Sequence, residues 1–307
     1  MGYVRCTDFL FKILFLTFIS SCSMKEPKPA YINYKIQEDY PSGSTISYLD
    51  GLYYIMGDDA SEMLVLDELL GETKRLQVFP KGKDFRIPKL IKADIEASAV
   101  IDQDGKQGIL FLGSGSLIPH RDGAFFFDPE NSKVKRLDYS RFYDQLRTQL
   151  KQLNIEAATV MGGNLVLGIR ANTSYPDNYL VVATANIAAP EFKRKIHLKL
   201  PVENTGISGM DYDPQNDILF MTFSSESTPN AVDDGPAGES YMAIIPEAME
   251  QFQNSDLTIP SLIKLTDLSS DFTHQKIESI SLINGERQLL LVADDDIGNT
   301  KFFRLNF

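Results

Sequence analysis

Cysteine is almost absent from this sequence, and histidine is rare. Only Cys6 and Cys22 occur among the 307 residues, so residues 23–307 contain no disulfide. The three histidines are dispersed along the chain, at His120, His197 and His274. A zinc site or a Ser-His-Asp triad would need such side chains to converge, and no G-x-S-x-G motif is present. The sequence therefore shows no evident pair of nucleophile and base.

Positive charge is also scarce. Thirty lysines and arginines stand against 42 aspartates and glutamates, which gives a formal net charge of −12. Such a surface repels phosphate backbones, so we expect no nucleic-acid partner. The hydrophobic fraction of 43% is that of a globular protein, and 307 residues suit a large all-β domain.

The amino terminus lacks an apolar run long enough to span a bilayer, which takes roughly 20 residues. Arg5 and Lys12 accompany a short apolar run at 13–19, as in a targeting segment. The run ends in Ile-Ser-Ser-Cys22, which resembles the bacterial lipobox. That resemblance implies that residues 1–22 are a lipoprotein signal, that Cys22 is lipidated, and that the outer membrane or the periplasmic face holds the protein. The alternative is a plain secretory signal with an incidental cysteine.

Residues 23–30, with two prolines, are then a tether, and residues 31–307 form one domain in which a repeat is visible. Each repeat is a β-like run, a turn rich in Gly, Asn or Asp, and a second apolar run that ends in small or acidic residues. Equivalent positions in the first runs are Ser44, Glu96, Glu156, Ser208 and Glu278. The turns Asp50-Gly51, Asp104-Gly105, Gly162-Gly163 and Asn284-Gly285 are typical of tight hairpins. Two further strand-like runs follow in most repeats, so the pattern predicts an all-β propeller with four-stranded blades.

The number of repeats predicts five blades, or six if the long fourth repeat hides a degenerate one. The last repeat stops after three strands, at 301–307. We therefore expect residues 31–37 to supply its fourth strand and close the ring, which leaves no free sheet edge. Apolar residues spaced four apart predict an inserted helix at 140–154, and 246–254 is expected to form a second, short helix.

Candidate site residues follow from the propeller. Inner strands line a central channel, so Glu96, Glu156 and Glu278 should converge there. The second runs end in Asp58, Asp59, Ser114, Arg170, Asn172, Ser224, Ser225, Asp294 and Asp295. Three carboxylates on one axis repel one another unless a cation lies among them. Oxygen ligands alone would favour calcium.

Three interpretations of the glutamates remain open. They could accept hydrogen bonds from the next blade as structural clasps, hold a divalent ion together, or act in catalysis. Arg170 could pair with a glutamate, which we favour, or hold an anionic ligand. Asp58 and Asp294 complete the set expected to bind a ligand.

The glutamate that opens each inner strand, followed by the terminal "LVADDD", resembles the esterase-like-activity-of-phytase family and related bacterial propeller-like lipoproteins. Glu96, Glu156 and Glu278 match the first feature; Asp58, Asp59, Asp294 and Asp295 match the second. Ser44 and Ser208 depart from the pattern, which interrupts a full acidic ring. The resemblance implies the propeller fold more firmly than an esterase activity.

Three functions are compatible with these features. The favoured one is a lipid-anchored envelope protein that binds a glycan, a peptide or another protein. The second is a calcium-assisted hydrolase of phosphoesters or lactones, with the central carboxylates as ligands. The third is a structural member of an envelope complex.

Overall fold

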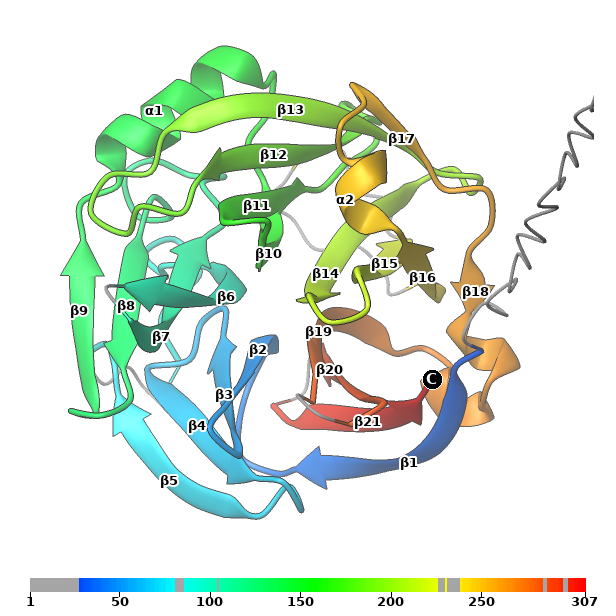
Figure 1. Ribbon diagram of the computed structural model, residues 1–307. Coiled ribbons are helices and arrows are strands. Elements are labelled where there is room, and N and C mark those ends of the chain that lie inside the picture. The colour runs from blue at the N-terminus through cyan, green and yellow to red at the C-terminus, as the bar shows by residue number, and fades with distance from the viewer. Residues whose placement is uncertain are drawn as a thin grey trace, which may run out of the picture.

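The computed structural model describes residues 28–80, 86–103, 105–225, 230, 238–283, 286–294 and 298–307. Its strands form five sheets arranged as a ring around a centre (Figure 1). The protein is therefore a five-bladed β-propeller, as the repeats predict, rather than a six-bladed one. In the described residues, no helix has the length and apolar character needed to cross a membrane.

Each blade is an antiparallel sheet in which the order of the strands leads from the centre of the propeller to its rim. Blade 1 contains β2 (Gly43–Leu49), β3 (Leu52–Gly57), β4 (Glu62–Asp67) and β5 (Glu72–Gln77). Blade 2 contains β6 (Ile95–Gln103), β7 (Lys106–Gly113), β8 (Ala124–Asp128) and β9 (Lys133–Leu137). Blade 3 contains β10 (Ile155–Met161), β11 (Asn164–Ile169), β12 (Asn178–Thr184) and β13 (Phe192–Lys199), with the short β17 (Asp256–Thr258) added in parallel at its outer edge.

Blades 4 and 5 complete the ring. Blade 4 contains β14 (Thr205–Asp213), β15 (Ile218–Ser225), β16 (Ser240–Pro246) and β18 (Ile263–Lys264). Blade 5 contains β19 (Lys276–Leu282), β20 (Gln288–Asp294), β21 (Thr300–Asn306) and, outermost, β1 (Ala30–Gln37). The first and the last strand of the described residues, β1 and β21, thus lie side by side in the same blade (Figure 1), which confirms the predicted ring closure.

The predicted hairpin turns form where they are described. Leu49 pairs with Leu52 and Met161 with Asn164, so both loops have two residues. Asp50, Gly51, Gly162 and Gly163 all have positive φ, as a type I′ turn requires. Asp104, Asn284 and Gly285, from the other two predicted turns, lie outside the described residues.

The hydrophobic core is divided among the gaps between blades. Five clusters of buried apolar side chains each join two neighbouring blades. Between blades 1 and 2, for example, the rings of Tyr54 and Phe127 lie 5.2 Å apart. The middle strands are buried on both faces, as in β3 and β7. This explains why their sequences are continuous apolar runs rather than alternating ones.

Both predicted helices are present. Helix α1 (Ser140–Gln149) turns Phe142, Tyr143 and Leu146 into the core between blades 2 and 3, and Tyr143 donates a hydrogen bond of 2.8 Å to the carbonyl of Gly113. Helix α2 (Ala248–Gln251) is a single turn between β16 and β17.

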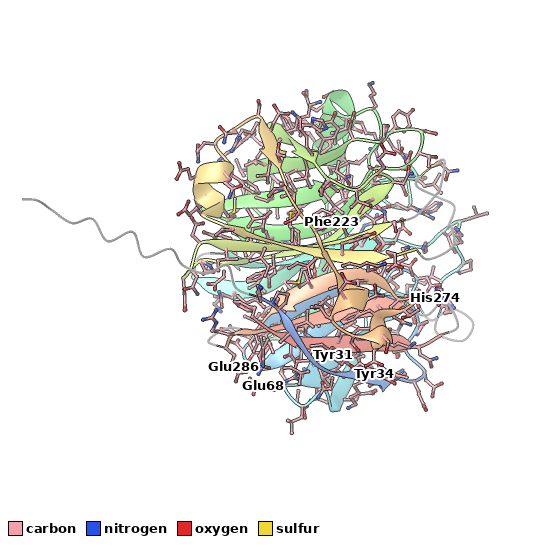
Figure 2. All side chains as sticks on the ribbon, turned by 90° about the vertical axis from the view of Figure 1, so that its right-hand side faces the viewer. Tyr31, Tyr34, Glu68, Phe223, His274 and Glu286 are labelled. Carbon is pink, nitrogen blue, oxygen red and sulfur yellow. The ribbon has the colours of Figure 1, made fainter. Side chains whose placement is uncertain are left out.

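The propeller has two faces, and different loops lie on each of them. We call the mouth face the one on which inner strands begin and second strands end; it includes loops 38–42, 86–94, 114–123, 170–177 and 265–275. His274 lies on this face, whereas Glu68 and Glu286 lie on the opposite face (Figure 2). Among the described residues, the candidates for the central channel and its mouth all belong to the mouth face.

At the other end of the inner strands, Asp211 of β14 ties three blades together. Its carboxylate accepts hydrogen bonds from the backbone N–H groups of Leu282 and Tyr212, both at 2.8 Å, and from the hydroxyl of Thr159 at 3.4 Å. Burial raises the pKa of Asp211 to about 6, because these hydrogen bonds offset the cost of burying the charge only in part.

The contribution of Asp211 to the free energy of unfolding should therefore fall as pH rises from about 4 to 6. In this window the folded state keeps a proton on Asp211 that the unfolded chain, with an aspartate pKa near 3.9, has lost. In the wild type, the titration of Asp211 lowers the free energy of unfolding between pH 4 and 7. In Asp211→Asn we expect this decrease to be smaller by about 1–3 kcal/mol. Urea unfolding at several pH values measures this, with Asp144→Asn on α1 as control. Equal pH dependence in the variant and the wild type would contradict the assignment.

Candidate functional site at the channel mouth

The five positions aligned in the sequence share one structural feature. Each inner strand has a β-bulge against its neighbour, and the residue passed over in the pairing is Ser44, Glu96, Glu156, Ser208 or Glu278. A bulge re-aims the side chain of the extra residue. The two serines are buried and bond within the protein: Ser44 donates to the carbonyl of Ile95 in blade 2 at 2.5 Å, and Ser208 to the hydroxyl of Thr222 at 3.2 Å. The three glutamates have charged or polar partners instead.

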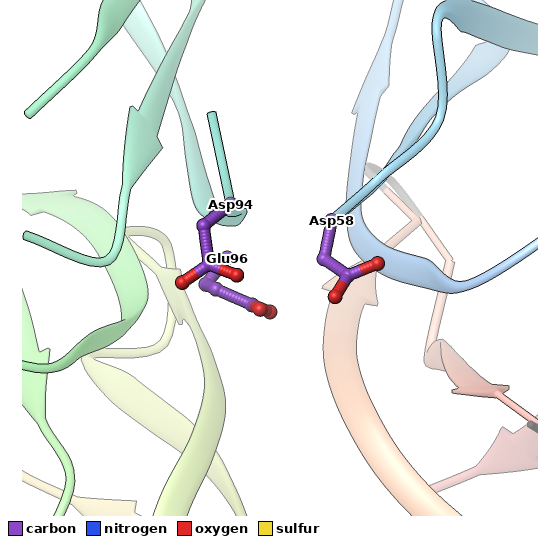
Figure 3. Close-up of side chains that lie close together, drawn as sticks. All are labelled: Asp58, Asp94 and Glu96. Atoms are coloured by element: carbon purple, nitrogen blue, oxygen red, sulfur yellow. The ribbon is translucent and has the colours of Figure 1, made fainter. Parts of the chain in front are cut away.

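Glu96 meets two aspartates at the mouth between blades 1 and 2. Asp58 follows β3, while Asp94 and Glu96 are at the start of β6, and the three side chains point toward one another (Figure 3). One carboxylate oxygen from each lies within 4.8 Å of the others. The structure thus brings Glu96 together with Asp58 and Asp94; Glu156 and Glu278, the other predicted ligands of a central ion, are not in this group.

Two cations already neutralise the aspartates. The ammonium of Lys92 forms ion pairs with Asp58 and, at 2.7 Å, with Asp94. The guanidinium of Arg121 is 2.8 Å from the other oxygen of Asp94, which also accepts a hydrogen bond from Ser114. Burial lowers the pKa of Lys92, but the charges of Asp58, Asp94 and Glu96 outweigh burial and raise it. Lys92 is therefore a permanent cation in this cluster.

Glu96 has an unusual protonation equilibrium. Burial raises its pKa well above the ordinary value, and the nearby negative charges of Asp94, Glu156 and Asp58 raise it further. A neutral carboxyl is a weaker ligand for a hard cation than a carboxylate. When it holds its proton, Glu96 can donate a hydrogen bond, whereas a cation bound among the three carboxyl groups would lower the pKa of Glu96.

Glu156 and Arg170 form the internal pair that the sequence analysis favoured. The Arg170 guanidinium is 3.5 Å from Glu156 and donates to the carbonyl of Ser224 in blade 4 at 3.4 Å. Asn154 donates to the other oxygen of Glu156 at 2.7 Å. A Cβ on Gly206 would lie 2.4 Å from Cγ of Arg170, so the arginine lies against bare backbone of the next blade. Arg170 therefore clasps blade 3 to blade 4.

Glu278 has a cation of its own. Lys276, two residues earlier, forms an ion pair with it at 3.0 Å. Asp294, at the end of β20, is paired opposite Lys276 in the sheet. Ser224 also clasps two blades, because its hydroxyl donates to the carbonyl of Ile277 in blade 5 at 2.8 Å. Asp295 and the predicted lipidation site Cys22 lie outside the described residues.

Sequence reasoning missed Lys92, Asp94, Arg121 and the ion pair of Arg86 with Asp59, at 2.7 Å. A signal for some of these was present. The residue two positions before each glutamate is Asp94, Asn154 or Lys276, and alternate residues of a strand share one face. Arg86 and Arg121 come from loops, so no strand periodicity could have indicated them.

Three solved structures illustrate what the chain is similar to. Glutaminyl cyclase of Myxococcus xanthus shares 11% identity and a TM-score of 0.47, over 91% of this chain and 96% of that one. Arabinanase Arb43A of Bacillus subtilis shares 11% identity and a TM-score of 0.49, over 88% and 95%. The β-propeller domain of Cps50 (Swd1) of Myceliophteria thermophila shares 7% identity and a TM-score of 0.42, over 88% and 99%. The activities of these proteins imply nothing for this chain.

Comparison of sequences identifies the family of the chain, which the solved structures do not. No curated protein matches the chain. Residues 39–307, which include four blades entirely and all of the fifth except β1, match a family of unknown function. The resemblance to the esterase-like-activity-of-phytase family is thus confirmed only as far as the propeller fold. The chain belongs to the family of unknown function DUF6929.

Proposed function

We propose that the protein is an exported, lipid-anchored binding protein of the cell envelope whose mouth face engages a glycan, a peptide or another protein. The lipobox at Cys22 supports the anchor. Labelling a bacterial host with radioactive palmitate tests it: the full chain should be labelled and Cys22→Ser should not.

One observation supports binding at the mouth face. Half of the large apolar side chains that are exposed in the described residues lie in its loops: Leu90, Ile91, Ile118 and Tyr175. Leu90 is 72% exposed and Ile118 61% exposed. Leu90 and Ile91 are neighbours in loop 86–94, which Arg121 joins to the loop 114–123 that carries Ile118. Exposed apolar side chains on adjoining loops favour a binding site for a partner or ligand. The charged groups beneath them are held by ion pairs between and within blades, which favours a rigid platform over a catalytic centre.

Binding should depend on the mouth face and not on the opposite one. All five sheets lie within residues 30–306, so a chain that begins at residue 23 keeps every strand and can be screened against glycan and peptide arrays. We expect Ile118→Asp to weaken any specific binding tenfold or more, as loss of a central apolar contact does. Leu69→Asp is the matched control, since Leu69 is 86% exposed in a turn between β4 and β5. Equal loss in both variants, or binding that neither affects, would contradict the proposal.

The calcium-assisted hydrolase is a second candidate, supported by the proximity of Asp58, Asp94 and Glu96. Because Lys92 already pairs with both aspartates, we expect calcium to leave the melting midpoint unchanged relative to chelator. A rise in the midpoint that Glu96→Gln abolishes would show binding to the folded state and favour the hydrolase. Assays with phosphoesters and lactones would then follow.

A further inference from the structure

A cavity of about 380 Å3 opens between blades 1 and 2, beside the mouth face. Its walls are largely apolar. Phe79 follows β5, Ile87 and Ile91 come from loop 86–94, and Phe125 comes from β8. The rings of Phe79 and Phe125 meet edge to face at 4.9 Å. This size and lining are typical of small-molecule sites, which run from roughly 300 to 1,000 Å3.

Two polar side chains line this cavity, Arg136 and His120. Arg136 is paired with Phe125 across β9 and β8, so both side chains lie on the same side of blade 2. Arg136 and His120 are both exposed, and neither has a hydrogen bond or ion pair with any described residue. The buried arginines behave differently, because Arg121 and Arg170 are held by carboxylates. The guanidinium of Arg136 is therefore available to a ligand.

The charge of the cavity is opposite to that of the protein as a whole. Among the described residues, its lining contains one arginine and one histidine but no aspartate or glutamate, although the net charge of the chain is −12. A guanidinium presents a planar pair of donors that matches a carboxylate, and the imidazole can add a further donor. Among the described lining residues, an organic cation would find apolar contacts but no carboxylate.

The walls are held in place before any ligand arrives. Arg121, which is 2% exposed, donates to Asp94 at 2.8 Å and to the carbonyl of Lys89 at 3.4 Å, both in loop 86–94. The same guanidinium bonds Ser116, in its own loop 114–123, at 2.9 Å. The buried arginine thereby fastens the two loops that flank the cavity. A preformed site loses less entropy when a ligand binds.

We propose that this cavity binds the carboxylate end of an apolar molecule, with Arg136 and His120 on the carboxylate and the Phe79, Phe125 and Ile91 side chains around the apolar body. The inference rests on the proposed binding function and names its ligand class. Acyl chains and the carboxyl-terminal residue of an apolar peptide share this chemistry.

Isothermal titration of the chain that begins at residue 23 tests the site with octanoate and N-acetylphenylalanine as probes. Octan-1-ol, octylamine and N-acetylphenylalanine amide have similar apolar bodies but no carboxylate. We expect saturable binding of at least one acid, tenfold or more tighter than its neutral analogue. Arg136→Gln should weaken the acid at least tenfold without affecting the neutral analogue. Arg141→Gln, at an exposed position of α1, should change neither affinity.

Preference for octanoate would identify an acyl chain as the ligand, and preference for N-acetylphenylalanine a peptide carboxyl terminus. Ile91→Asp, which places a negative charge in the wall at a position 54% exposed, should abolish binding of either acid. The proposal is overturned if neither acid binds, if the amine or neutral analogue binds as tightly, or if Arg136→Gln leaves the affinity unchanged. Array binding that Ile118→Asp abolishes would survive such a result, so failure of this inference is distinct from failure of the proposed function.

Discussion

Asp94→Asn should lower the free energy of unfolding by about 3–5 kcal/mol, the cost of leaving buried cations without their partner. Asp94 is 3% exposed. Its carboxylate forms ion pairs with Lys92 and Arg121 and accepts a hydrogen bond from Ser114. The amide of asparagine keeps the shape of the side chain but cannot neutralise either cation. Lys92 would retain Asp58, whereas Arg121 would keep only uncharged acceptors. Urea unfolding followed by circular dichroism at pH 7 measures the loss.

The control for this prediction is an ion pair on the surface. Lys106 and Glu130 are 2.8 Å apart and both more than 60% exposed, so Glu130→Gln should cost far less than Asp94→Asn, because solvent screens an exposed ion pair. Similar losses in Asp94→Asn and Glu130→Gln would show that the buried network stabilises the fold no more than a solvated pair. The predicted difference would then be wrong.

A chain that begins at Glu38 should fail to form the native ring. It lacks β1, which pairs with β21 from Ala30↔Asn306 to Gln37↔Thr300. It also loses two contacts between aromatic side chains. The ring centroids of Tyr31 and Phe272 are 5.7 Å apart, and those of Tyr34 and Phe303 are 5.8 Å apart. We expect the loss to approach the whole stability of a domain, about 5–15 kcal/mol. The exposed edge of β21 should then promote aggregation.

Circular dichroism and size-exclusion chromatography test this expectation against the chain that begins at residue 23, which keeps β1. A synthetic peptide with the sequence of Ala30–Gln37 should restore folding in part, because a free strand can add to an open sheet edge. A cooperative melt of the shortened chain at the midpoint of the control would show that blade 5 is stable without its outer strand.

The repeats and turns could be predicted because each depends on residues close together in the sequence. The ring closure joins the two ends of the described chain, Ala30–Gln37 and Thr300–Asn306, but it followed from the strand that the last repeat lacks. Asp50-Gly51 and Gly162-Gly163 determine two-residue turns by their own backbone preferences. The apolar runs that follow them become the second strands of their blades. Phe142 and Leu146 likewise mark the buried face of α1.

The partners of the candidate glutamates could not be predicted so fully. A shared position at the start of an inner strand suggested that Glu96, Glu156 and Glu278 would act alike, yet each meets different groups. Glu156 lies beside Arg170, which the sequence indicated. Glu96 lies among Asp58 and Asp94, with Lys92 between those aspartates. Ion pairing of this kind depends on distances between loops of neighbouring blades, which strand periodicity does not encode.

The sequence by itself determined the four-stranded blades and the strand that closes the ring, because local hydrogen bonding and burial on both faces of a strand impose a pattern on consecutive residues. It left the number of blades between five and six, and the structure has five. Only the tertiary structure decided which charges meet and where a cavity opens. Arg121 reaches Asp94 and Lys89 across two loops, and Arg136 is left facing the cavity beside Phe125. Such contacts arise from the packing of one blade on the next, which brings together residues that no local pattern links.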